Sequence, residues 1–289
     1  MGRPSPATGA TAAAGNLAPM PEDPLVDVVV VAYNSRDHLR ACVEGVAGLP
    51  WVRVIVVDNA SPDRSLDAVA GMAGVTAIAQ PRNGGFAYGC NAGLRAGSAP
   101  YVLFLNPDAT ITGPDLRALV ARLEAAPDAG IVGPRIVHDD GSLDYSIRRF
   151  PSLRSTYAQA LFLHRLAPSA AWTDELVRDR DRYTRPGPVD WLSGACLLCR
   201  RDVLERIGGL DEGFFLYCED IDLCRRVWDG GGAVRYEPGV TVRHAGGASH
   251  PRAGLLPVLV RSRLRYARKH RGRPAAAAER AGVALGEAT

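Results

Sequence analysis

The stretch Tyr101-Val-Leu-Phe-Leu-Asn-Pro-Asp-Ala109 decides the fold of this chain. Its first five residues are apolar, which is typical of a strand buried on both faces of a parallel sheet. Asn106-Pro107-Asp108 then ends the strand abruptly and delivers a carboxylate at its C-terminal end. Because α/β folds bind ligands at the carboxyl ends of parallel strands, this stretch predicts both the fold class and the position of its site.

The same alternation of strand, short loop and helix extends from Asp27 to Val137 and predicts a doubly wound, mostly parallel sheet. Strands are expected at 27–32, 52–57, 75–79, 101–105 and 131–137, and helices at 36–47, 65–72, 86–96 and 114–125. After residue 138 the alternation stops. There we expect hairpin-like turns at 139–149, a helix at 151–166, a strand at 191–199, helices at 201–207 and 219–228, and short strands at 233–236 and 241–242. Since no internal repeat or long linker is present, we expect one domain, residues 25–250, whose second half covers the cleft of the first.

Composition limits the function classes. The 289 residues are 47% hydrophobic, which is enough for a sizeable core, and a net charge of +3 does not indicate a nucleic-acid partner. No stretch approaches the ~20 apolar residues of a membrane span, and the N-terminus lacks an apolar signal core, so a cytoplasmic location is expected. The six cysteines predict buried thiols, with Cys196 and Cys199 on opposite faces of a strand.

Both ends of the chain differ from its centre. Residues 1–24 are rich in Ala, Pro and Gly and predict a disordered tail. Between Arg252 and Arg273 there are eight basic residues, no acidic ones and several leucines, which predict a helix at 251–273, followed by a flexible tail at 274–289. This helix either docks on the domain with a solvated basic face or lies on an anionic membrane surface, which would place the protein peripherally at the inner face of the membrane.

Polar residues follow three of the predicted strands, at Tyr33-Asn34, Asp58-Asn59 and Asn106-Pro107-Asp108. Each alone is explained by a turn or a helix cap. Together on one sheet edge they predict a cleft. Asp108 suits Mg²⁺ or Mn²⁺ beside a diphosphate, or it caps the loop before Thr110. His244, after a strand, is more often a structural residue than a ligand.

A second acidic cluster, Glu219-Asp220 with Asp222, opens a predicted helix. The helix dipole explains carboxylates there, and Asp222 is spaced to pair with Arg225 or Arg226. The preceding Phe214-Phe-Leu-Tyr217 would also desolvate a neighbouring carboxylate and raise its pKa, which suits a general base. Because Glu219 and Asp220 point in different directions, at most one should face a substrate hydroxyl.

These motifs occur in the order found in family 2 glycosyltransferases, and the chain resembles the rhamnosyltransferase-like branch of that family from about Asp27 to Gly247. The similar segments are Val31-Ala-Tyr-Asn34, Val57-Asp-Asn-Ala-Ser61, Asn83-Gly-Gly-Phe86, Leu105-Asn-Pro-Asp-Ala109, Leu192-Ser-Gly-Ala195, Gly208-Gly-Leu-Asp-Glu-Gly-Phe-Phe215, Glu219-Asp-Ile-Asp-Leu223 and His244-Ala-Gly-Gly. Ser146-Ile-Arg-Arg-Phe-Pro151 is also similar to a segment of that branch.

The resemblance implies a GT-A fold, with a nucleotide-sugar-binding half at 25–137 and an acceptor and catalytic half at 138–250. It implies a nucleotide-diphosphate sugar donor, an acceptor that is a glycan, a lipid-linked molecule or a small molecule, and Mg²⁺ or Mn²⁺. The implied residues are Tyr33, Asn34, Asp58, Asn83, Asn106 and Asp108 for the donor, Asp108 and His244 for the metal, Asp220 and its partner Glu219 for catalysis, and Trp191 and Ser193 for the acceptor. Asn106 departs from the first acid of the family's D-x-D motif.

The implied reaction is direct displacement with inversion, in which Asp220 takes a proton from the acceptor hydroxyl. By resemblance, the first choice of donor is deoxythymidine-diphosphate-rhamnose (dTDP-rhamnose). One alternative is a sugar nucleotidyltransferase, although those enzymes place a Gly-rich loop where this chain has Tyr33-Asn34. Another is a non-catalytic sugar- or membrane-binding protein with the same fold.

Overall fold

The computed structural model describes residues 24–167, 170–246 and 252–288. A nine-stranded sheet forms its centre, in the order β3-β2-β1-β4-β10-β6-β11-β5, and β8 also pairs with β11. These strands are β1 Val26–Ala32, β2 Val52–Asp58, β3 Val75–Ala79, β4 Tyr101–Leu105, β5 Ala109–Thr110, β6 Ala129–Val137, β8 Gly187–Pro188, β10 Cys196–Arg200 and β11 Ala233–His244. A separate small sheet pairs β7 (Ile147–Arg148) with β9 (Trp191–Leu192).

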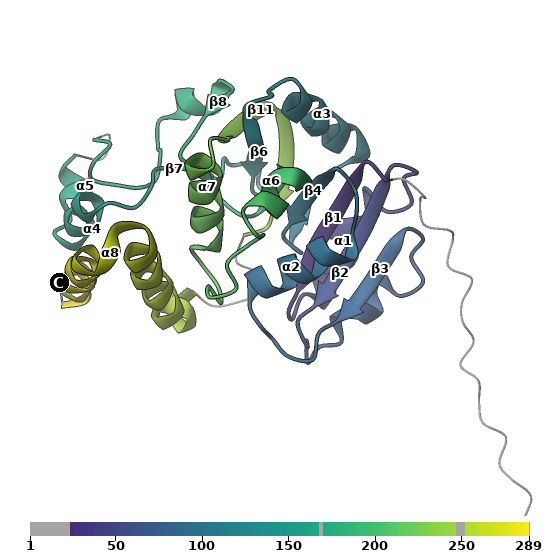
Figure 1. Cartoon of the computed structure of the whole chain (residues 1–289), viewed down its shortest axis with the longest axis horizontal. Coiled ribbons are helices and arrows are strands. Elements are labelled where there is room, and N and C mark those ends of the chain that lie inside the picture. Colours follow the sequence, from purple (N-terminus) through teal and green to yellow (C-terminus); the bar gives the residue numbers. More distant parts are fainter. Residues whose placement is uncertain (1–23, 168–169, 247–251, 289) are drawn as a thin grey trace, which may run out of the picture.

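Helices cover both faces of the central sheet (Figure 1). The helices of the described residues are α1 Arg36–Glu44, α2 Phe86–Ala96, α3 Gly113–Glu124, α4 Leu153–Ala160, α5 Leu163–Leu166, α6 Arg201–Arg206, α7 Glu219–Asp229 and α8 Leu256–Ala288, with single 3₁₀ turns at Ser65–Val69, Arg180–Thr184 and Arg252–Leu255. Of these, α1 and α3 pack on one face of the sheet and α2, α6 and α7 on the other, whereas α4, α5 and the last part of α8 lie beside it. None of these helices is both long enough and apolar enough to cross a bilayer within the described part of the chain.

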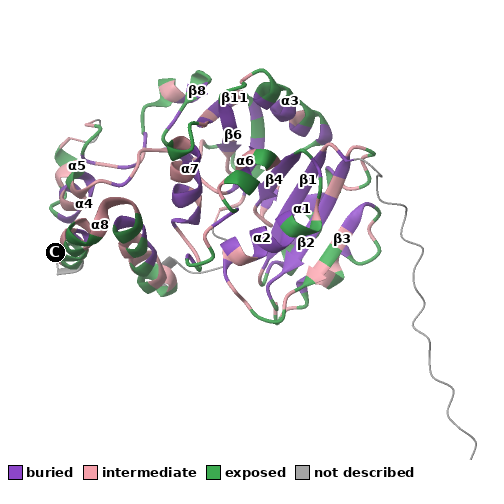
Figure 2. Cartoon of the chain, in the orientation of Figure 1, coloured by how far each residue is buried: buried purple, intermediate pink, exposed green. Residues whose placement is uncertain are grey.

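Alternating side chains of the strands feed two cores, one on each face of the sheet. In β1, Val28 and Val30 pack with α1 and α3, whereas Val29 and Val31 pack with α2, α6 and α7. Figure 2 shows the central strands buried along most of their length. The predicted doubly wound, mostly parallel sheet is therefore confirmed. Cys196 belongs to the first core and Cys199 to the second, and all six cysteines are free and buried, as expected.

The second half of the chain does more than cover the cleft of the first, because it supplies strands to the same sheet. β10 lies between β4 and β6 and is antiparallel to both. The predicted strand at 191–199 is therefore wrong as one unit, since it divides at Ser193-Gly194-Ala195 into β9 and β10. The two short strands predicted at 233–236 and 241–242 form one strand, β11, which is irregular between Glu237 and Thr241.

The C-terminal part also differs from expectation. Residues 251–273 contain the predicted helix, and its inner face docks on the domain through Ser262, Tyr266 and Ala267. The flexible tail expected at 274–289 is wrong for the described residues, since α8 continues to Ala288 after a break at Gly272, where φ is +83°. The helix predicted at 151–166 divides into α4 and α5, and the one predicted at 65–72 is only a 3₁₀ turn. The expected disordered tail at 1–24 lies outside the described residues, apart from Pro24.

Candidate active site

One edge of the sheet gathers most of the predicted site residues. The parallel strands β1, β4, β6 and β11 end there, at Tyr33, Asn106, His138 and His244. Since β10 runs the opposite way, its beginning lies at the same edge, where the Asn106 N–H donates to the Ala195 carbonyl at 2.9 Å. This antiparallel insertion explains why residues 193–195, nearly ninety positions after Asn106, stand beside it.

A pocket of about 660 Å³, the central pocket, opens at this edge. It is lined by Val31, Tyr33, Ser35, Asn59, Asn83, Gly85, Phe86, Asn106, Pro107, Asp108, His138, Asp144, Arg148, Ser193, Phe215, Leu216, Tyr217, His244, Gly246 and Leu255. Six of the predicted site residues are among them, namely Tyr33, Asn83, Asn106, Asp108, Ser193 and His244. The other five, Asn34, Asp58, Trp191, Glu219 and Asp220, are not.

Asp108 and His244 meet at one end of the central pocket. The His244 Nε2 lies 3.2 Å from Asp108 Oδ1 and 3.3 Å from the Asn106 side-chain amide nitrogen, while Nδ1 lies 3.7 Å from Asp144 Oδ2. Burial alone would lower the pKa of His244, but the two carboxylates outweigh it and raise the pKa to about 9. Burial opposes ionisation of Asp108 as well, yet its contact with His244 lowers the pKa of that carboxyl.

The donor atoms at this end suit a hard divalent cation that completes its shell elsewhere. A carboxylate oxygen and an imidazole nitrogen already lie within contact distance of each other and face the same pocket. Within the described residues, no group of three or more His, Cys, Asp or Glu side chains is arranged to hold a metal ion. Two protein ligands fit Mg²⁺ or Mn²⁺ provided that diphosphate oxygens and water supply the rest.

The second acidic pair stands at the first turn of α7, after two residues in the left-handed conformation, Tyr217 (φ 67°) and Cys218 (φ 65°). Asp220 is half-buried, and its carboxylate accepts hydrogen bonds from the Gly194 N–H at 3.1 Å and the Ile221 N–H at 2.8 Å. Gly194 follows Ser193, which lines the central pocket. Asp220 therefore adjoins the pocket through this loop and is not itself part of the lining.

Glu219 is only 6% exposed, and its Oε2 has no hydrogen-bond partner. Burial raises the pKa of Glu219 well above its ordinary value, and the neighbouring charge of Asp220 adds to this effect. Burial also raises the pKa of Asp220, although the two backbone N–H donors and the charge of Arg148 oppose the shift. The pair therefore consists of one deeply buried acid and one half-buried acid next to the pocket.

At the opposite end of the sheet edge, Tyr33 and Asn83 line the pocket, whereas Asp58 and Asn34 shape the loop beside it. Asp58 accepts a hydrogen bond from the Ser61 N–H at 3.1 Å, and the Asn34 N–H donates to the Ser61 hydroxyl at 3.2 Å. Of the two residues Asp58 and Asn59, only Asn59 lines the pocket. Its amide donates to the Gly85 carbonyl at 2.9 Å, and its Oδ1 has no hydrogen-bond partner.

Gly85 has no room for a side chain. Its φ is +92°, and an added Cβ would collide with the Phe215 carbonyl, which accepts the Phe86 N–H at 2.9 Å. The Asn-Gly-Gly-Phe segment therefore joins the start of α2 to the 215–217 loop.

Trp191 and Ser193 behave differently from each other. Ser193 lines the pocket, but Trp191 is 6% exposed and its indole N–H donates to the Arg149 carbonyl at 2.8 Å. The pocket side of Trp191 is covered by Arg148, whose guanidinium carbon lies 5.5 Å from the ring centroid.

Sequence reasoning missed five polar side chains of the pocket: Ser35, His138, Asp144, Arg148 and Tyr217. Asp144, Arg148 and Tyr217 stand in loops or in the two-residue strand β7, so no long apolar strand precedes them as a signal. Ser35 and His138 come shortly after β1 and β6, where the strand pattern could have indicated them. The one available signal for Arg148 was its place in the Ser-Ile-Arg-Arg-Phe-Pro segment.

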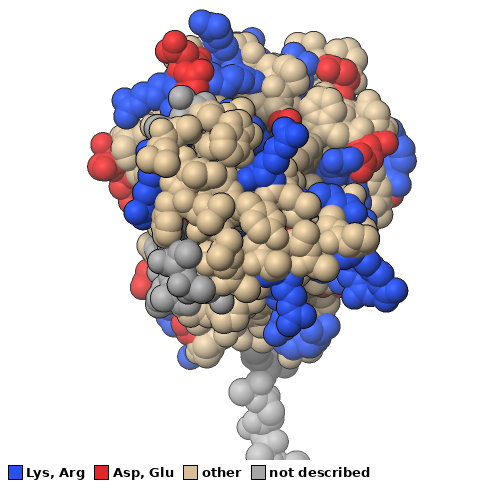
Figure 3. All heavy atoms as spheres, turned by 90° about the vertical axis from the view of Figure 1, so that its left-hand side faces the viewer, with Lys and Arg blue, Asp and Glu red and all other residues tan. Residues whose placement is uncertain are grey.

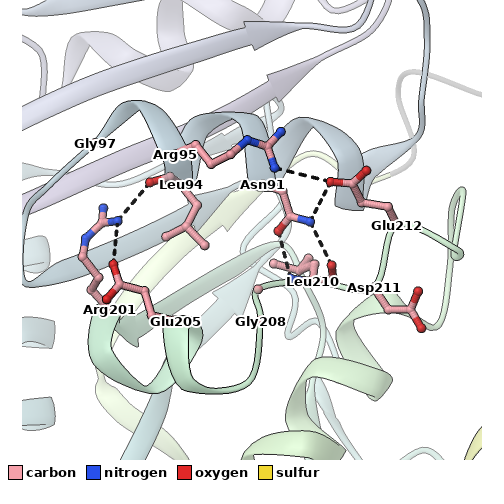
Figure 4. A pocket seen from close by; sticks show the side chains of 11 residues that line it. Asn91, Leu94, Arg95, Gly97, Arg201, Glu205, Gly208, Leu210, Asp211 and Glu212 are labelled. Carbon is pink, nitrogen blue, oxygen red and sulfur yellow. Dashed lines mark hydrogen bonds and ion pairs between the residues drawn. The ribbon is translucent and has the colours of Figure 1, made fainter.

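A second cavity, of about 650 Å³, lies between α2 and the 205–212 segment and shares no lining residue with the central pocket (Figure 4). Asn91 joins α2 to the 205–212 segment, since its side-chain amide donates to the Leu210 carbonyl at 2.8 Å and its Oδ1 accepts from the Leu210 N–H at 2.9 Å. Asn91 also donates to Glu212 at 3.0 Å, and Arg95 lies 3.6 Å from the same carboxylate. Its polar groups thus bind each other, and it contains none of the predicted site residues.

Residues 27–208 match the sequence profile of the family described as Glycosyl transferase family 2. The N-acetylglucosaminyl-diphospho-decaprenol L-rhamnosyltransferase of Mycobacterium tuberculosis is 32% identical to the chain over 234 residues, which are 76% of this chain and 76% of that protein. Rhamnosyltransferase WbbL of Escherichia coli is 27% identical over 234 residues, which are 76% of this chain and 83% of that protein.

A likeness in fold extends to solved structures. The mannosyltransferase PcManGT from Pyrobaculum calidifontis, in complex with GDP-Man and Mn²⁺, superposes with a TM-score of 0.52 at 21% identity. The superposition covers 88% of this chain and 64% of that one, slightly less than two thirds of its length. At this identity the likeness concerns the fold, which is the GT-A fold expected from the sequence.

Proposed function

Because this chain belongs to glycosyl transferase family 2, we propose that it transfers a sugar, with inversion, from a nucleotide diphosphate to an acceptor hydroxyl. The observation that carries the proposal is the sheet edge at which Asp108 and His244 line one pocket with Ser193, while Asp220 is hydrogen-bonded to the backbone of the neighbouring Gly194.

The donor occupies the half of the site built by residues 25–137, and the acceptor enters from residues 138–250. Tyr33, Asn83 and Asn106 contact the donor, while Asp58 and Asn34 shape its loop. dTDP-rhamnose remains the first choice of donor, since two relatives are named rhamnosyltransferases. The acceptor is a glycan, a lipid-linked molecule or a small molecule, and Ser193 stands where it enters.

Asp108 and His244 would hold Mg²⁺ or Mn²⁺, which when bound would neutralise charge that develops on the departing nucleoside diphosphate. Asn106 contributes an amide next to His244 and leaves Asp108 as the nearest full negative charge. Chelation with EDTA should abolish transfer, and added Mg²⁺ or Mn²⁺ should restore it. Undiminished transfer in the chelator would remove Asp108 and His244 from this role.

Asp220 accepts the proton of the acceptor hydroxyl as the new bond forms. Its two backbone N–H donors, at Gly194 and Ile221, each bind one carboxylate oxygen and fix the orientation of the carboxylate, which retains lone pairs to accept the proton. Glu219, buried behind it, is a partner that shapes the environment of the base.

The test is Asp220→Asn, which preserves the volume of the side chain. It should keep nucleotide binding, measured by thermal shift with a panel of nucleoside diphosphates and Mn²⁺, and reduce transfer by about 10²–10⁴-fold. Asp202→Asn, on exposed α6, is the matched control and should retain full activity. Near-full turnover by Asp220→Asn would disprove the assignment of the base.

A further inference from the structure

Arg148 is a charged side chain of the central pocket that has no carboxylate within ion-pair distance in the part of the chain that the structure describes. It lines the pocket, yet in the described residues it forms no ion pair and its buried Nε has no hydrogen-bond partner. Two other enclosed arginines behave differently: Arg226 and Arg263 hold carboxylates at 2.7 and 2.6 Å. Leaving a guanidinium unpaired inside a concave surface costs free energy, so its position calls for a ligand.

The backbone and the ring beneath Arg148 hold it in place. In β7 it pairs with Trp191 of β9 on one side and forms a bridge to Leu176 on the other. The Trp191 ring, fixed by its hydrogen bond to the Arg149 carbonyl, supports the guanidinium from one face. An arginine held this way, with its donors unused, is suited to bind phosphate oxygens in the plane of the guanidinium.

The neighbours of Arg148 assign it to the acceptor side. Trp191 leads through Leu192 to Ser193, and the next residue, Gly194, holds Asp220. Within the described residues, Arg148 forms no hydrogen bond or ion pair with Asp108 or His244, the pair proposed for the donor diphosphate, which contact each other. We infer that Arg148 binds a phosphate or diphosphate group carried by the acceptor, an inference that rests on the proposed glycosyl transfer.

The competing role is purely electrostatic. Arg148 lowers the pKa of Asp220 and of Asp144 through its charge, so it could serve only to keep these carboxylates ionised. In that case its removal would affect every acceptor alike and move the acid limb of the rate profile. A phosphate-binding role instead distinguishes acceptors with a phosphate from those without one.

The binding experiment uses inorganic pyrophosphate in EDTA, so that no cation can bridge it to Asp108. Calorimetry should show binding to the wild type that is about 10–100-fold weaker in Arg148→Met and intermediate in Arg148→Lys, as for a lost charge-assisted hydrogen bond. Arg95→Met, in the second cavity, is the control and should bind as the wild type does. Equal binding by Arg148→Met would overturn the inference, whether or not the protein transfers sugar.

The kinetic experiment compares two acceptors, octyl N-acetylglucosaminyl diphosphate and octyl N-acetylglucosaminide. In Arg148→Met, KM for the diphosphate acceptor should rise about 10–100-fold, while KM for the glycoside and for the donor stays unchanged. An equal loss with both acceptors, or a rise in the donor KM, would overturn the acceptor assignment. Hydrolysis of the donor by the wild type in the absence of an acceptor tests the proposed function separately, because that reaction involves no acceptor phosphate.

Discussion

At the scale of single residues, Glu219 and Asp220 show how two adjacent carboxyls acquire different roles. Glu219 is nearly inaccessible with an unpaired oxygen, whereas Asp220 is half-buried and bound by two backbone N–H groups. Burial raises the pKa of both acids, but for Asp220 the backbone N–H groups of Gly194 and Ile221 and the charge of Arg148 all favour the ionised form. Asp220 therefore suits a base, and Glu219 remains neutral at a higher pH than Asp220 does.

This difference predicts the pH profile of transfer. The active form of Asp220 is the carboxylate, so kcat/KM should be constant at high pH and fall tenfold per unit below the pKa of Asp220. Because burial raises that pKa, the decline should begin above the ordinary aspartate range near 3.8. Initial rates at saturating metal, measured between about pH 4 and 9, would locate the limb. A rate independent of pH across this range would contradict a titrating base with a raised pKa.

The variant Glu219→Gln, measured in the same assay, tests whether Glu219 is ionised or neutral when Asp220 titrates. If Glu219 is already neutral when Asp220 ionises, a neutral glutamine should leave the acid limb in place. A limb displaced to lower pH would show instead that Glu219 is ionised and raises the pKa of Asp220 by repulsion.

Residues that directly follow apolar strands could be predicted as site residues, and those in loops could not. Asp108 lies in the short loop after β4 and His244 is the last residue of β11, so the alternation of strands indicated their place. Asp144 and Arg148 belong to a segment whose position depends on the pairing of β7 with β9. Nothing local in the sequence encodes that pairing, so sequence reasoning could not bring either residue into the pocket.

At the scale of elements, Asp222 connects α7 to α8. Its fully buried carboxylate lies 2.7 Å from Arg226 Nε, 2.7 Å from Lys269 Nζ and 2.7 Å from His270 Nε2. The pairing of Asp222 with Arg226 was expected from their spacing, whereas the contacts with α8 were not. Removing the carboxylate leaves Arg226 and Lys269 close together without their shared buried counter-charge, so Asp222→Asn should lower the free energy of unfolding by about 3 kcal/mol.

The measurement is chemical denaturation across a range of pH, with Asp229→Asn as the control from the same helix. Asp229 pairs with Arg225 at 2.9 Å on the surface and should cost at most about 1 kcal/mol. Burial alone would raise the pKa of Asp222, but its partners lower it, so its stabilisation is present above the unfolded-state value near ~3.9 and is lost as the pH falls through the folded-state value. A difference from wild type no larger than that of Asp229→Asn would refute this role.

Elements of the first half could be predicted with nearly correct bounds because each consists of one periodic pattern. β3, β4 and α2 have the predicted bounds. The divisions in the second half depend on distant partners. Ser193-Gly194-Ala195 interrupts an otherwise apolar run because the Ser193 N–H donates to the Ser146 carbonyl and the Ala195 carbonyl accepts from Asn106. The hydrophobic pattern alone cannot reveal a change of sheet within such a run.

At the scale of the whole molecule, the end formed by α4, α5 and the last part of α8 exposes apolar side chains (Figure 1). The exposed fraction is 83% for Leu166, 50% for Leu161, 49% for Trp172 and 36% for Phe162. Arg154 and Arg165 are exposed in the same segment, and no Asp or Glu occurs between Tyr145 and Thr173. Figure 3 shows this end as a largely uncharged surface, with many Lys and Arg and fewer Asp and Glu around it. We propose that this combination fits an anionic lipid surface better than the docked helix at 251–273 does.

The protein should therefore sediment with vesicles that contain phosphatidylglycerol, and much less with pure phosphatidylcholine. The double variant Phe162→Ser, Leu166→Ser should weaken vesicle binding at least about tenfold, since each of these side chains buries apolar area in the interface.

The contribution of charge is tested separately. Arg165→Glu should weaken vesicle binding in a salt-dependent way. Arg64→Glu makes the same change of charge at the start of the 3₁₀ turn between β2 and β3 and should have little effect. The strands β2 and β3 lie at the opposite end of the molecule from α4 and α5 (Figure 1). Equal losses from Arg165→Glu and Arg64→Glu would mean that only net charge attracts the protein, and unaltered binding by the double serine variant would place the contact elsewhere. Nucleotide binding with Mn²⁺, measured on the same variants, would verify that the central pocket is intact in each.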